Sequence, residues 1–534
     1  MQESAVGSAP AVFGGRWFSP EPEPALFGSR CPGCGRLDFP PRGLCPACGR
    51  PGPERVRLAD EGVIETYTTV HVAPPGFQAP YQVGIIALTD GLRVAAPLRA
   101  DEAPVDFGQA VRLEAAVIRR DNGTPVLGYR FRTVPRSVRA AAAPRPRPAV
   151  PPVNWALPGP VWVAGVAMTA FGKQPDRSAE ELLLEAALRA VADAGIEAGR
   201  VQALFAGTAF GGTAAGQRLL KESPWGGRPV VNVENACASG TTALIEAATW
   251  VALGRCDVAL AVGFDRVASA GGGLIALPPD DPLAGVGVSL PALYALLGNR
   301  YLHEAGATAR ELAAVVVKSR RHAAANPYAC MRNPLTPEEV LAARPIADPL
   351  TLYMCTPNAD GAAAAVLVSD RARRLAGGRP VRLRAAAIRA GLVQDRLEEP
   401  SIVAEAAREA YEAAGLGPED VDVAEVHDAF APAEPMLIEK LGFAPHAEGL
   451  RRLAAGHYAL GGPGVTVNPS GGLLSRGHPP GATGLAQVYE VVTQLRGEAG
   501  PRQVPGARVG LVHNQGGTVL DIETNACVVL ILTR

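Results

Sequence analysis

The chain contains two copies of one domain-sized unit. Shifting the sequence against itself by 241 residues places Gly240-Thr-Thr-Ala-Leu on Gly481-Ala-Thr-Gly-Leu, and the apolar runs that follow, 245–253 and 486–494, stay in step. A shift of 220 residues places residues 186–196 on 406–416 in the same way. These spacings are far longer than the roughly 20–50 residues of solenoid repeats, so the sequence predicts two similar α/β halves.

The duplication pairs a cysteine with a histidine. Under the shift of 241 residues, Cys237 falls on His478, and each of them stands just before a predicted helix. If the two halves pack about a pseudo-twofold axis, the thiol and the imidazole meet. This pair is therefore the first candidate for a chemical site.

Length, charge and cysteine use limit the classes of protein that remain. A chain of 534 residues exceeds the roughly 100–200 typical of one domain, so we expect two or three folding units. Its 51 basic and 52 acidic residues give a net charge of −1, which favours neither nucleic acid nor an anionic membrane as partner. No targeting segment and no run of roughly 18 apolar residues is present. We expect a soluble cytoplasmic protein, because nine cysteines without a disulfide pattern suit a reducing compartment.

A change of pattern divides the chain in two. Residues 134–160 are rich in Pro, Ala and Arg and lack a hydrophobic period, which predicts a semi-rigid linker. Before the linker, strand-like segments alternate with turn signals, which predicts a small β-barrel or sandwich. After it the pattern becomes βαβα, with a helix at about 178–194 that Ser178 and Glu181 begin as a capping box.

Two Cys-x-x-Cys pairs near the N-terminus predict a metal site. Four thiolates at this spacing supply the tetrahedral sulfur set that zinc favours, and they leave no open position for catalysis. The gap of ten residues between the pairs is shorter than usual, so iron and chance spacing remain as alternatives. The predicted ligands of this structural zinc are Cys31, Cys34, Cys45 and Cys48.

A zinc ribbon beside a β-barrel also occurs in proteins that bind nucleic acid. Such barrels normally present a basic groove with aromatic side chains that stack on bases. Here the aromatic residues are sparse and lie in apolar strands or Pro-rich turns, namely Tyr67, Phe77, Tyr81 and Phe107. We therefore expect no nucleic acid as partner.

Four motifs after the linker carry reactive side chains. Cys237 precedes a helix, where free amides and the helix dipole would lower the thiol pKa. His427 ends an apparent strand, and His478 stands in Gly-His-Pro-Pro-Gly. His513 lies where a strand enters a Gly-rich turn. Each residue alone could be structural, but four strand ends together predict a nucleophile, a base and polar donors.

These motifs resemble the thiolase superfamily. The resemblance lies in CASG at Cys237, in the GHPPGATG and HDAF motifs and in the terminal Gly-rich turn. HDAF, with KSRRHAAANPYA at 318–329, is similar to the sterol-carrier-protein (lipid-transfer-protein) type of thiolase. The first 135 residues resemble the zinc-ribbon/OB-fold proteins that accompany such thiolases as acyl-CoA-associated subunits.

The resemblance implies a duplicated thiolase fold of five αβαβα layers, usually assembled as a homodimer. We predict a zinc-ribbon segment at 1–54, an OB-fold β-barrel at 55–133 and the linker at 134–160. The N-terminal thiolase half then covers 161–385, with a loop domain at about 265–345, and the C-terminal half covers 386–534.

The resemblance also implies roles for residues. Cys237 would take the acyl group of an acyl-CoA as a thioester, His478 would accept its proton, and His427 with backbone amides would form oxyanion holes. Asn468, Gly516 and Gly517 are expected around the substrate. Thiolases use a second cysteine for proton transfer, in the terminal turn or in HDCF, where this chain has His513 and Ala429. Full thiolase chemistry then requires His513 to act as acid or base.

Three functions follow from these residues. The first is a thiolase-type acyl-CoA C-acyltransferase of lipid metabolism that makes or cleaves a carbon–carbon bond of a β-ketoacyl-CoA. The second is a retro-aldolase, similar to steroid side-chain aldolases, that cleaves a β-hydroxyacyl-CoA with tyrosines such as Tyr294 and Tyr353. The third is a non-catalytic CoA-binding scaffold. Because Cys237 is present, we favour acyl transfer.

Overall fold

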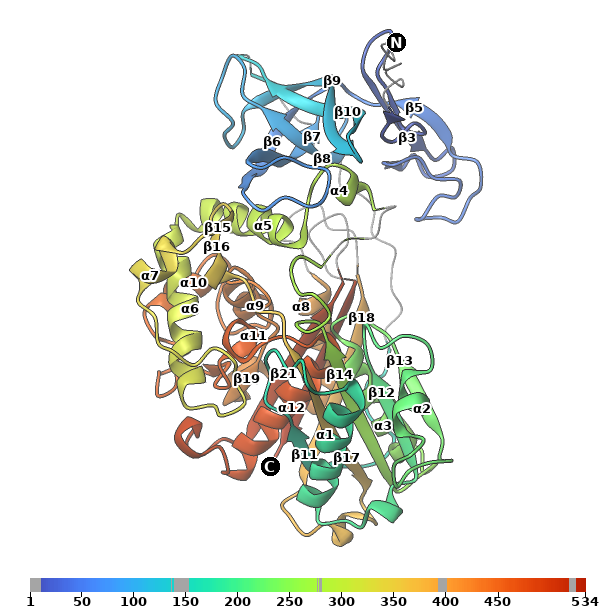
Figure 1. The fold of residues 1–534 in the computed structure, drawn as a ribbon, viewed down its shortest axis with the longest axis vertical. Coiled ribbons are helices and arrows are strands. Elements are labelled where there is room, and N and C mark those ends of the chain that lie inside the picture. Colours follow the sequence, from blue (N-terminus) through green and yellow to red (C-terminus); the bar gives the residue numbers. More distant parts are fainter. Residues whose placement is uncertain are drawn as a thin grey trace, which may run out of the picture. The chain divides into compact units, whose positions relative to one another are not determined.

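The computed structural model describes residues 11–135, 137–138, 153–275, 277, 281–391, 401–517 and 525–534. The chain forms two compact units (Figure 1). The small unit contains the chain up to residue 152 together with 274–303 and 344–351; the large unit contains 153–273, 304–343 and 352–534. Most of the predicted linker lies outside the described residues. Among the described residues, no helix has both the length and the apolar character needed to span a bilayer.

The large unit is built around a ten-stranded sheet with two equivalent halves. The first half has the order β13-β12-β14-β17-β11, and the second has the mirrored order β18-β22-β21-β19-β20. The first-half strands are β11 (Val161–Met168), β12 (Ala203–Gly207), β13 (Val230–Val233), β14 (Val258–Arg266) and β17 (Asp360–Ser369). The second-half strands are β18 (Val381–Ala390), β19 (Val423–Glu425), β20 (Thr466–Val467), β21 (Val509–Gly516) and β22 (Ala526–Thr533).

Strand direction follows the same plan in both halves. The pairs β12–β13 and β12–β14 are parallel, as are β19–β20 and β19–β21. The remaining pairs within each half are antiparallel, and β11 joins β18 at the centre through Val161 and Leu383. The sequence duplication is therefore a structural duplication.

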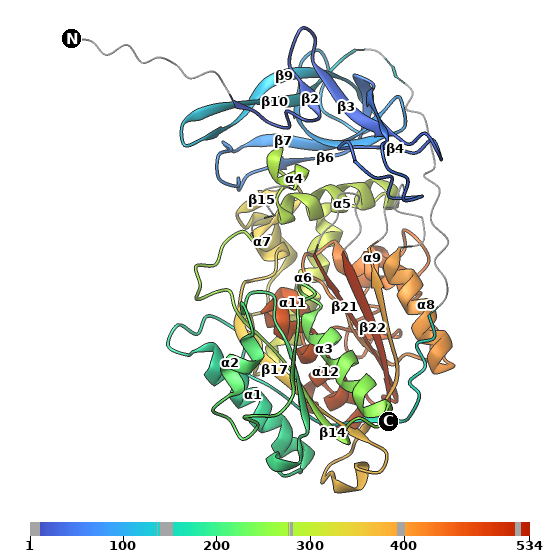
Figure 2. The same cartoon turned by 90° about the vertical axis from the view of Figure 1, so that its right-hand side faces the viewer.

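Four long helices complete the layers. Helix α1 (Ala179–Ala194) packs on β11, β14 and β17, and α8 (Ile402–Ala414) packs on β18 and β22. Helices α3 (Ser239–Ala252) and α12 (Pro480–Arg496) contact each other, and α12 contacts strands of both halves (Figure 2). The five layers are thus α1, the first-half strands, α3 with α12, the second-half strands, and α8, as the resemblance to the thiolase superfamily implied.

Local sequence explains where these helices begin and end. Ser178 and Glu181 form the predicted capping box of α1, and Gly195 ends that helix in the left-handed conformation. Strand β17 is buried on both faces because its alternate side chains meet two different cores. Ala363, Ala365 and Leu367 face the layer of α3 and α12, whereas the residues between them face α1.

Further helices cover both halves of the large unit. Helix α6 (Ala309–Ala324) packs on α7 (Pro337–Ala342), α10 (Gly449–Ala454) and α11 (Gly472–Arg476). Helix α9 (Ala433–Lys440) follows the HDAF segment, and α2 (Ala215–Leu220) covers β12 and β13. Through α11, the α6 helix lies beside the loop that carries His478.

The small unit contains a closed five-stranded barrel. Its strands are β6 (Glu61–Val70), β7 (Tyr81–Leu88), β8 (Arg93–Arg99), β9 (Ala110–Asp121) and β10 (Thr124–Thr133). They close in the order β6-β7-β8-β10-β9, with β9 returning to β6. Along β6 buried and half-buried residues alternate strictly, as expected for a strand with one face in a core. This ring is the predicted OB-fold barrel.

Two segments from far along the chain belong to the small unit. Helices α4 (Pro282–Gly285) and α5 (Leu290–Ala305) lie mainly in it, with strands β15 (Pro345–Ala347) and β16 (Leu350–Thr351). Strand β15 pairs with β6, and the Thr66 hydroxyl donates to the Leu296 carbonyl at 2.7 Å. The region predicted as a loop domain of the first thiolase half is therefore shared between the two units.

The two halves of the large unit approach each other closely at two glycines. A Cβ atom on Gly240 would lie 2.3 Å from the carbonyl oxygen of Gly481, its counterpart in the duplication. Because that oxygen belongs to the backbone, a side chain at residue 240 would force α3 and α12 apart. Glycine is therefore required at this crossing.

We predict that Gly240→Ala lowers stability by roughly 1–3 kcal/mol, since overpacking against backbone cannot be relieved by a rotamer change. The measurement is thermal unfolding, with Gly199→Ala as the control. A Cβ at Gly199 meets no atom within 4 Å, so that variant should melt at the wild-type temperature. Equal melting temperatures for both variants would contradict the close crossing.

Candidate active site

The duplicated halves bring a thiol and an imidazole together. Cys237 lies in the turn between β13 and α3, and His478 lies between α11 and α12. The Nε2 atom of His478 is 3.2 Å from the Sγ atom of Cys237. Ala236, just before the cysteine, has a left-handed φ of 47°, and the Ser239 hydroxyl donates to its carbonyl at 2.6 Å. This strained turn presents the thiol to the histidine.

Hydrogen bonds fix the tautomer of His478. The Thr483 hydroxyl donates its hydrogen to the Pro479 carbonyl at 2.8 Å, so its oxygen accepts from His478 Nδ1 at 2.7 Å. The proton of the neutral ring is then on Nδ1. The lone pair of Nε2 faces Cys237, which is the arrangement of a base that accepts the thiol proton.

His427 has the opposite tautomer. The Thr241 hydroxyl donates to Asn514 Oδ1 at 2.8 Å, which orients the amide so that its Nδ2 donates to His427 Nδ1 at 2.9 Å. The ring proton of His427 is therefore on Nε2. The His427 and His478 rings meet edge to face with centroids 5.1 Å apart. His427 thus offers an N–H donor beside a ring that offers a lone pair.

Burial keeps the site uncharged at rest. Desolvation raises the pKa of Cys237 to about 12, and nearby Asp265 adds to this, while the N–H groups of Gly517 and of Cys237 itself act against it. The sequence predicted a lowered thiol pKa from the helix end, and this prediction is wrong because desolvation dominates. Burial also lowers the pKa of His478 to about 3 and places that of His427 well below its usual range.

The terminal turn lies against the nucleophile. A Cβ on Gly516 would lie 2.7 Å from the Cys237 nitrogen, so the two backbones are in direct contact. The amide of Gly517 points at the thiol, as its effect on the Cys237 pKa indicates. The amides of Gly517 and Cys237 therefore converge beside Sγ, where a developing oxyanion needs donors.

His513 is not part of the group formed by Cys237, His427 and His478. On β21 it pairs with Val529, whereas Asn514 pairs with Val528, which belongs to the core around α3 and α12. Because cross-strand partners share a face, His513 points to the other side of the sheet. Its Nδ1 accepts from the His427 backbone N–H at 3.4 Å, so it supports His427 from behind.

Asn468 holds the chain that leads to His427. It has a left-handed φ of 54° and is fully buried. Its Oδ1 accepts from the Val426 N–H at 2.8 Å, and its Nδ2 donates to Glu434 at 3.2 Å. Asn468 is thus bonded to protein through both atoms of its amide.

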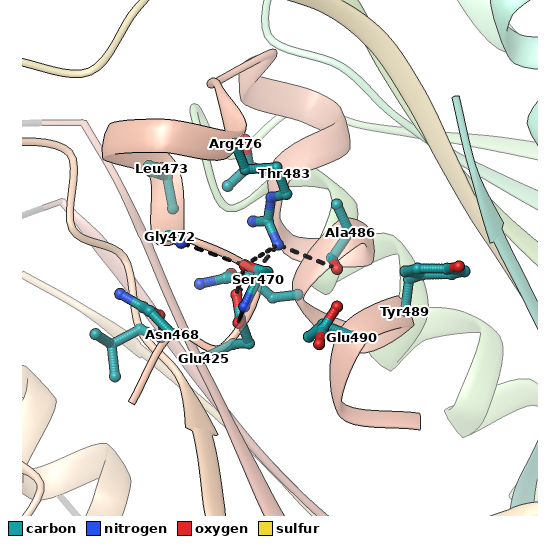
Figure 3. A network of polar contacts seen from close by, with 12 residues as sticks. Glu425, Asn468, Ser470, Gly472, Leu473, Arg476, Thr483, Ala486, Tyr489 and Glu490 are labelled. Carbon is teal, nitrogen blue, oxygen red and sulfur yellow. Dashed lines mark hydrogen bonds and ion pairs between the residues drawn. The ribbon is translucent and has the colours of Figure 1, made fainter. Parts of the chain in front are cut away.

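A buried ion pair ties the two histidine loops together (Figure 3). Arg476 Nη1 donates to Glu425 Oε2 and to Ser470 Oγ, both at 3.1 Å, and Glu425 also accepts from the backbone and hydroxyl of Ser470. Glu425 precedes His427 by two residues, and Arg476 precedes His478 by two. Burial raises the pKa of Glu425 to about 7, against the opposing effect of Arg476.

The two tyrosines of the aldolase hypothesis lie in different units. Tyr353 lies in the short 3₁₀ helix η2 (Leu352–Met354) of the large unit, with the Arg320 guanidinium 5.4 Å from its ring centroid. Tyr294 lies on α5 in the small unit and is half-buried. No role follows from these positions alone.

The four N-terminal cysteines fit zinc. Strand β3 (Ala25–Arg30) leads into the first pair, and the second pair comes before β5 (Glu54–Arg57). The Sγ atoms of Cys31 and Cys48 are 3.5 Å apart, and those of Cys34 and Cys45 are 3.6 Å apart. Tetrahedral zinc with sulfur at about 2.3 Å requires sulfur separations of about 3.8 Å. A zinc ion there would be closed to substrate.

Models of four domain families match the chain in order. They are "ChsH2, rubredoxin-like zinc ribbon domain" at residues 18–54, "ChsH2, C-terminal OB-fold domain" at 55–116, "Thiolase, N-terminal domain" at 161–371 and "Thiolase C-terminal domain-like" at 393–532. The benzoylsuccinyl-CoA thiolase subunit BbsB of Thauera aromatica is 39% identical over 366 residues, which are 67% of this chain and 94% of that protein. The chain belongs to the thiolase family.

Two further relatives indicate which type of thiolase the chain resembles. An acetyl-CoA acetyltransferase of Methanothermobacter thermautotrophicus is 39% identical over 370 residues, 67% of this chain and 96% of that protein. Human sterol carrier protein 2 is 38% identical over 382 residues, 67% of this chain and 70% of that protein. The predicted likeness to sterol-carrier-type thiolases, with a zinc ribbon and OB fold ahead of them, is confirmed.

Among solved structures, the thiolase resembles an "Ltp2-ChsH2(DUF35) aldolase" with a TM-score of 0.61 and 28% identity. The match covers 71% of this chain and 98% of that chain. The chain is therefore a thiolase-type protein acting on acyl-CoA thioesters, with a structural zinc ribbon.

Sequence reasoning missed the three residues that set the tautomers. Thr483 lies in the GHPPGATG motif, and Thr241 and Asn514 lie within four residues of Cys237 and next to His513, respectively, but neither motif assigns them a role. A signal for Asn514 exists: in the strand VGLVHNQG, strict alternation puts Asn514 and His513 on opposite faces. No local signal connects Thr241 with Asn514, because they are 273 positions apart in the sequence.

We predict one tightly bound zinc per chain, held by the four cysteines, and unfolding of the ribbon when it is removed. Structural zinc in small domains contributes on the order of 10–16 kcal/mol, more than a ribbon of this size can replace by packing. Metal analysis by mass spectrometry, followed by limited proteolysis with and without chelator, checks this. Fully reduced protein without zinc would refute the site, and Cys256→Ser should change nothing.

We also predict that alkylation of Cys237 accelerates continuously with pH. Its raised pKa of about 12 keeps the thiolate scarce at neutral pH. The rate with iodoacetamide should therefore rise about tenfold per pH unit from 7 to 9, whereas an ordinary cysteine levels off near its pKa of about 8.5. A rate that is already constant at pH 7 would show instead a preformed thiolate and imidazolium.

Proposed function

We propose that this thiolase transfers an acyl group through a thioester on Cys237 and makes or cleaves the carbon–carbon bond of a β-ketoacyl-CoA. The observation that carries the proposal is the 3.2 Å approach of Cys237 Sγ to a His478 nitrogen whose lone pair is free. A thiol with an adjacent base is the arrangement that nucleophilic catalysis requires.

In the first half-reaction the proton moves only between this pair and the CoA sulfur. As Sγ bonds to the thioester carbon, the thiol proton passes to His478 Nε2, and the carbonyl oxygen becomes an oxyanion beside the amides of Cys237 and Gly517. When the bond to the CoA sulfur breaks, that sulfur takes the proton from His478. The products are an acyl-Cys237 and free CoA, and the histidine is neutral again.

The second half-reaction needs a base at the α-carbon of a second acyl-CoA. Among the described residues, the titratable side chains grouped with Cys237 are His427 and His478. His478 has a free lone pair on Nε2 again after the first step, so it is the base. It removes the α-proton, while the Nε2 proton of His427 stabilises the enolate oxygen. The carbanion attacks the acyl-Cys237 carbonyl, a carbon–carbon bond forms, and the cysteine leaves as thiolate and recovers the proton from His478.

The acid/base role predicted for His513 stays a prediction. Its contact with the His427 backbone supports a positioning role, because a shift of that backbone would move the Nε2 donor. A homodimer and a cytoplasmic location also belong to the proposal. Thiolase relatives support the first, and the fact that none of the nine cysteines forms a disulfide supports the second.

A retro-aldolase remains the second candidate. The observation that favours it is the solved aldolase structure, since that protein also joins a thiolase-like chain to a ChsH2 chain. Such a reaction would cleave a β-hydroxyacyl-CoA without a covalent intermediate, so Cys237 would be dispensable.

We predict that Cys237→Ala abolishes turnover and also abolishes the acyl adduct seen by intact-protein mass spectrometry after exposure to acyl-CoAs. Loss of the nucleophile removes the only atom that can carry the acyl group, so the loss should exceed about 10⁴-fold. Cys256→Ala, a change at a buried cysteine outside the site, is the control. An active Cys237→Ala variant that cleaves a β-hydroxyacyl-CoA would establish the aldolase instead.

A further inference from the structure

Among the described residues of the large unit, one buried cation has no carboxylate partner. Five basic side chains are buried among the described residues. Four of them pair with a carboxylate, namely Lys318 with Glu434 at 2.8 Å, Arg476 with Glu425 at 3.1 Å, Arg496 with Asp193 at 2.7 Å and Arg502 with Glu490 at 2.9 Å. The fifth is Arg320, which is 5% exposed.

Arg320 is surrounded by groups that do not neutralise it. Its Nε has no hydrogen-bond partner, and the neighbours that act on it electrostatically are Cys330 and Tyr353. The guanidinium lies 5.4 Å from the Tyr353 ring centroid, a contact that favours a cation but does not cancel its charge. An arginine stays protonated in proteins, so this side chain is a buried charge without an anion.

Both neighbours of Arg320 adjoin the catalytic loops. The backbone N–H of Cys330 donates to the Arg476 carbonyl, and its Sγ would lie 3.1 Å from a Cβ on Gly477, next to His478. Two residues after Tyr353, Cys355 pairs with Phe430 of the HDAF segment. Arg320 is therefore held between the two segments that border His478 and His427.

A buried unpaired charge is costly, and proteins normally keep one only where a ligand completes it. Planar guanidinium groups match carboxylates with two parallel hydrogen bonds. In CoA thioesters the phosphates are separated from the reacting carbonyl by the whole pantetheine arm. A carboxylate on the acyl chain, in contrast, lies within a few bonds of that carbonyl. The location of Arg320 beside the histidine loops favours the acyl chain as the source.

We propose that Arg320 binds a carboxylate on the acyl group, so that the substrate is an acyl-CoA with a second acid function. This inference rests on the proposed acyl transfer at Cys237. Arg320 is then a specificity-determining residue that contacts substrate.

The test compares thioesters of equal carbon number with and without the carboxylate: succinyl-CoA with butyryl-CoA, glutaryl-CoA with valeryl-CoA, and adipyl-CoA with hexanoyl-CoA. The readout is the rate of Cys237 acylation by intact-protein mass spectrometry. Wild-type protein should prefer the carboxylated member of at least one pair. Arg320→Met should lose about 10–150-fold of that rate, the range for a hydrogen bond between charged groups, and change the neutral thioester by less than about threefold.

Two control variants separate binding from structure. Arg320→Lys keeps the charge and should recover part of the preference, and Arg321→Met changes an exposed neighbour and should behave as wild type. Arg320→Met should melt at or above the wild-type temperature, because an unpaired charge is removed. Arg502→Met should melt lower, since it leaves Glu490 buried without its partner.

Calorimetry on Cys237→Ala makes the test independent of acyl transfer. If no thioester acylates the wild type, the proposed function fails. The Arg320 proposal then stands only if Cys237→Ala binds a carboxylated thioester more tightly than its neutral counterpart, and if adding Arg320→Met to Cys237→Ala removes that preference. Equal rates and equal binding within every pair would overturn the proposal. So would an equal loss for both members of each pair and for free CoA, which would identify a CoA phosphate as the ligand.

Discussion

The backbone contact between Gly240 and Gly481 is the constraint on which the active site depends. Helix α3 can approach α12 this closely only because Gly240 carries no Cβ. Cys237 stands three residues before one glycine and His478 three residues before the other. The crossing therefore sets the separation of thiol and imidazole, and a sequence duplication becomes a reactive pair through the packing of two helices.

Around the active site, ionisable side chains are either paired or uncharged. Thiol and imidazoles are uncharged at rest because burial disfavours their ionic forms. Beside them, a fully buried ion pair between Glu425 and Arg476 fixes the positions of the loops that carry His427 and His478. A neutral site flanked by a fixed ion pair can develop charge during reaction without reorganising its surroundings, which is the condition for electrostatic stabilisation of a transition state.

Sequence could predict what depends on spacing and repetition. The duplication predicted that Cys237 meets His478, and the Cys-x-x-Cys spacing predicted the zinc ligands, because both depend on positions along the chain. It could not predict the thiol pKa, since desolvation depends on what the fold places around Sγ. Local pattern did not connect Asn514 with Thr241, and nothing in KSRRHAAANPYA distinguishes the unpaired Arg320 from the paired Lys318. The predicted domain boundaries stay predictions.

The small unit shows why those boundaries are hard to draw from sequence. Its barrel strand β6 pairs with β15, although more than 270 residues separate Val70 from Ala347. The hydroxyls of Thr66 and Thr68 donate to the carbonyls of Leu296 and Asp348, and that of Tyr81 to the carbonyl of Gly287. A chain that ended at residue 133 would leave these hydroxyls without their acceptors and the end of β6 at Val70 without its partner strand β15. The small unit is thus completed by residues 274–303 and 344–351, which are inserted in the thiolase sequence. We therefore expect the zinc-ribbon and OB-fold region to need the thiolase region in order to fold.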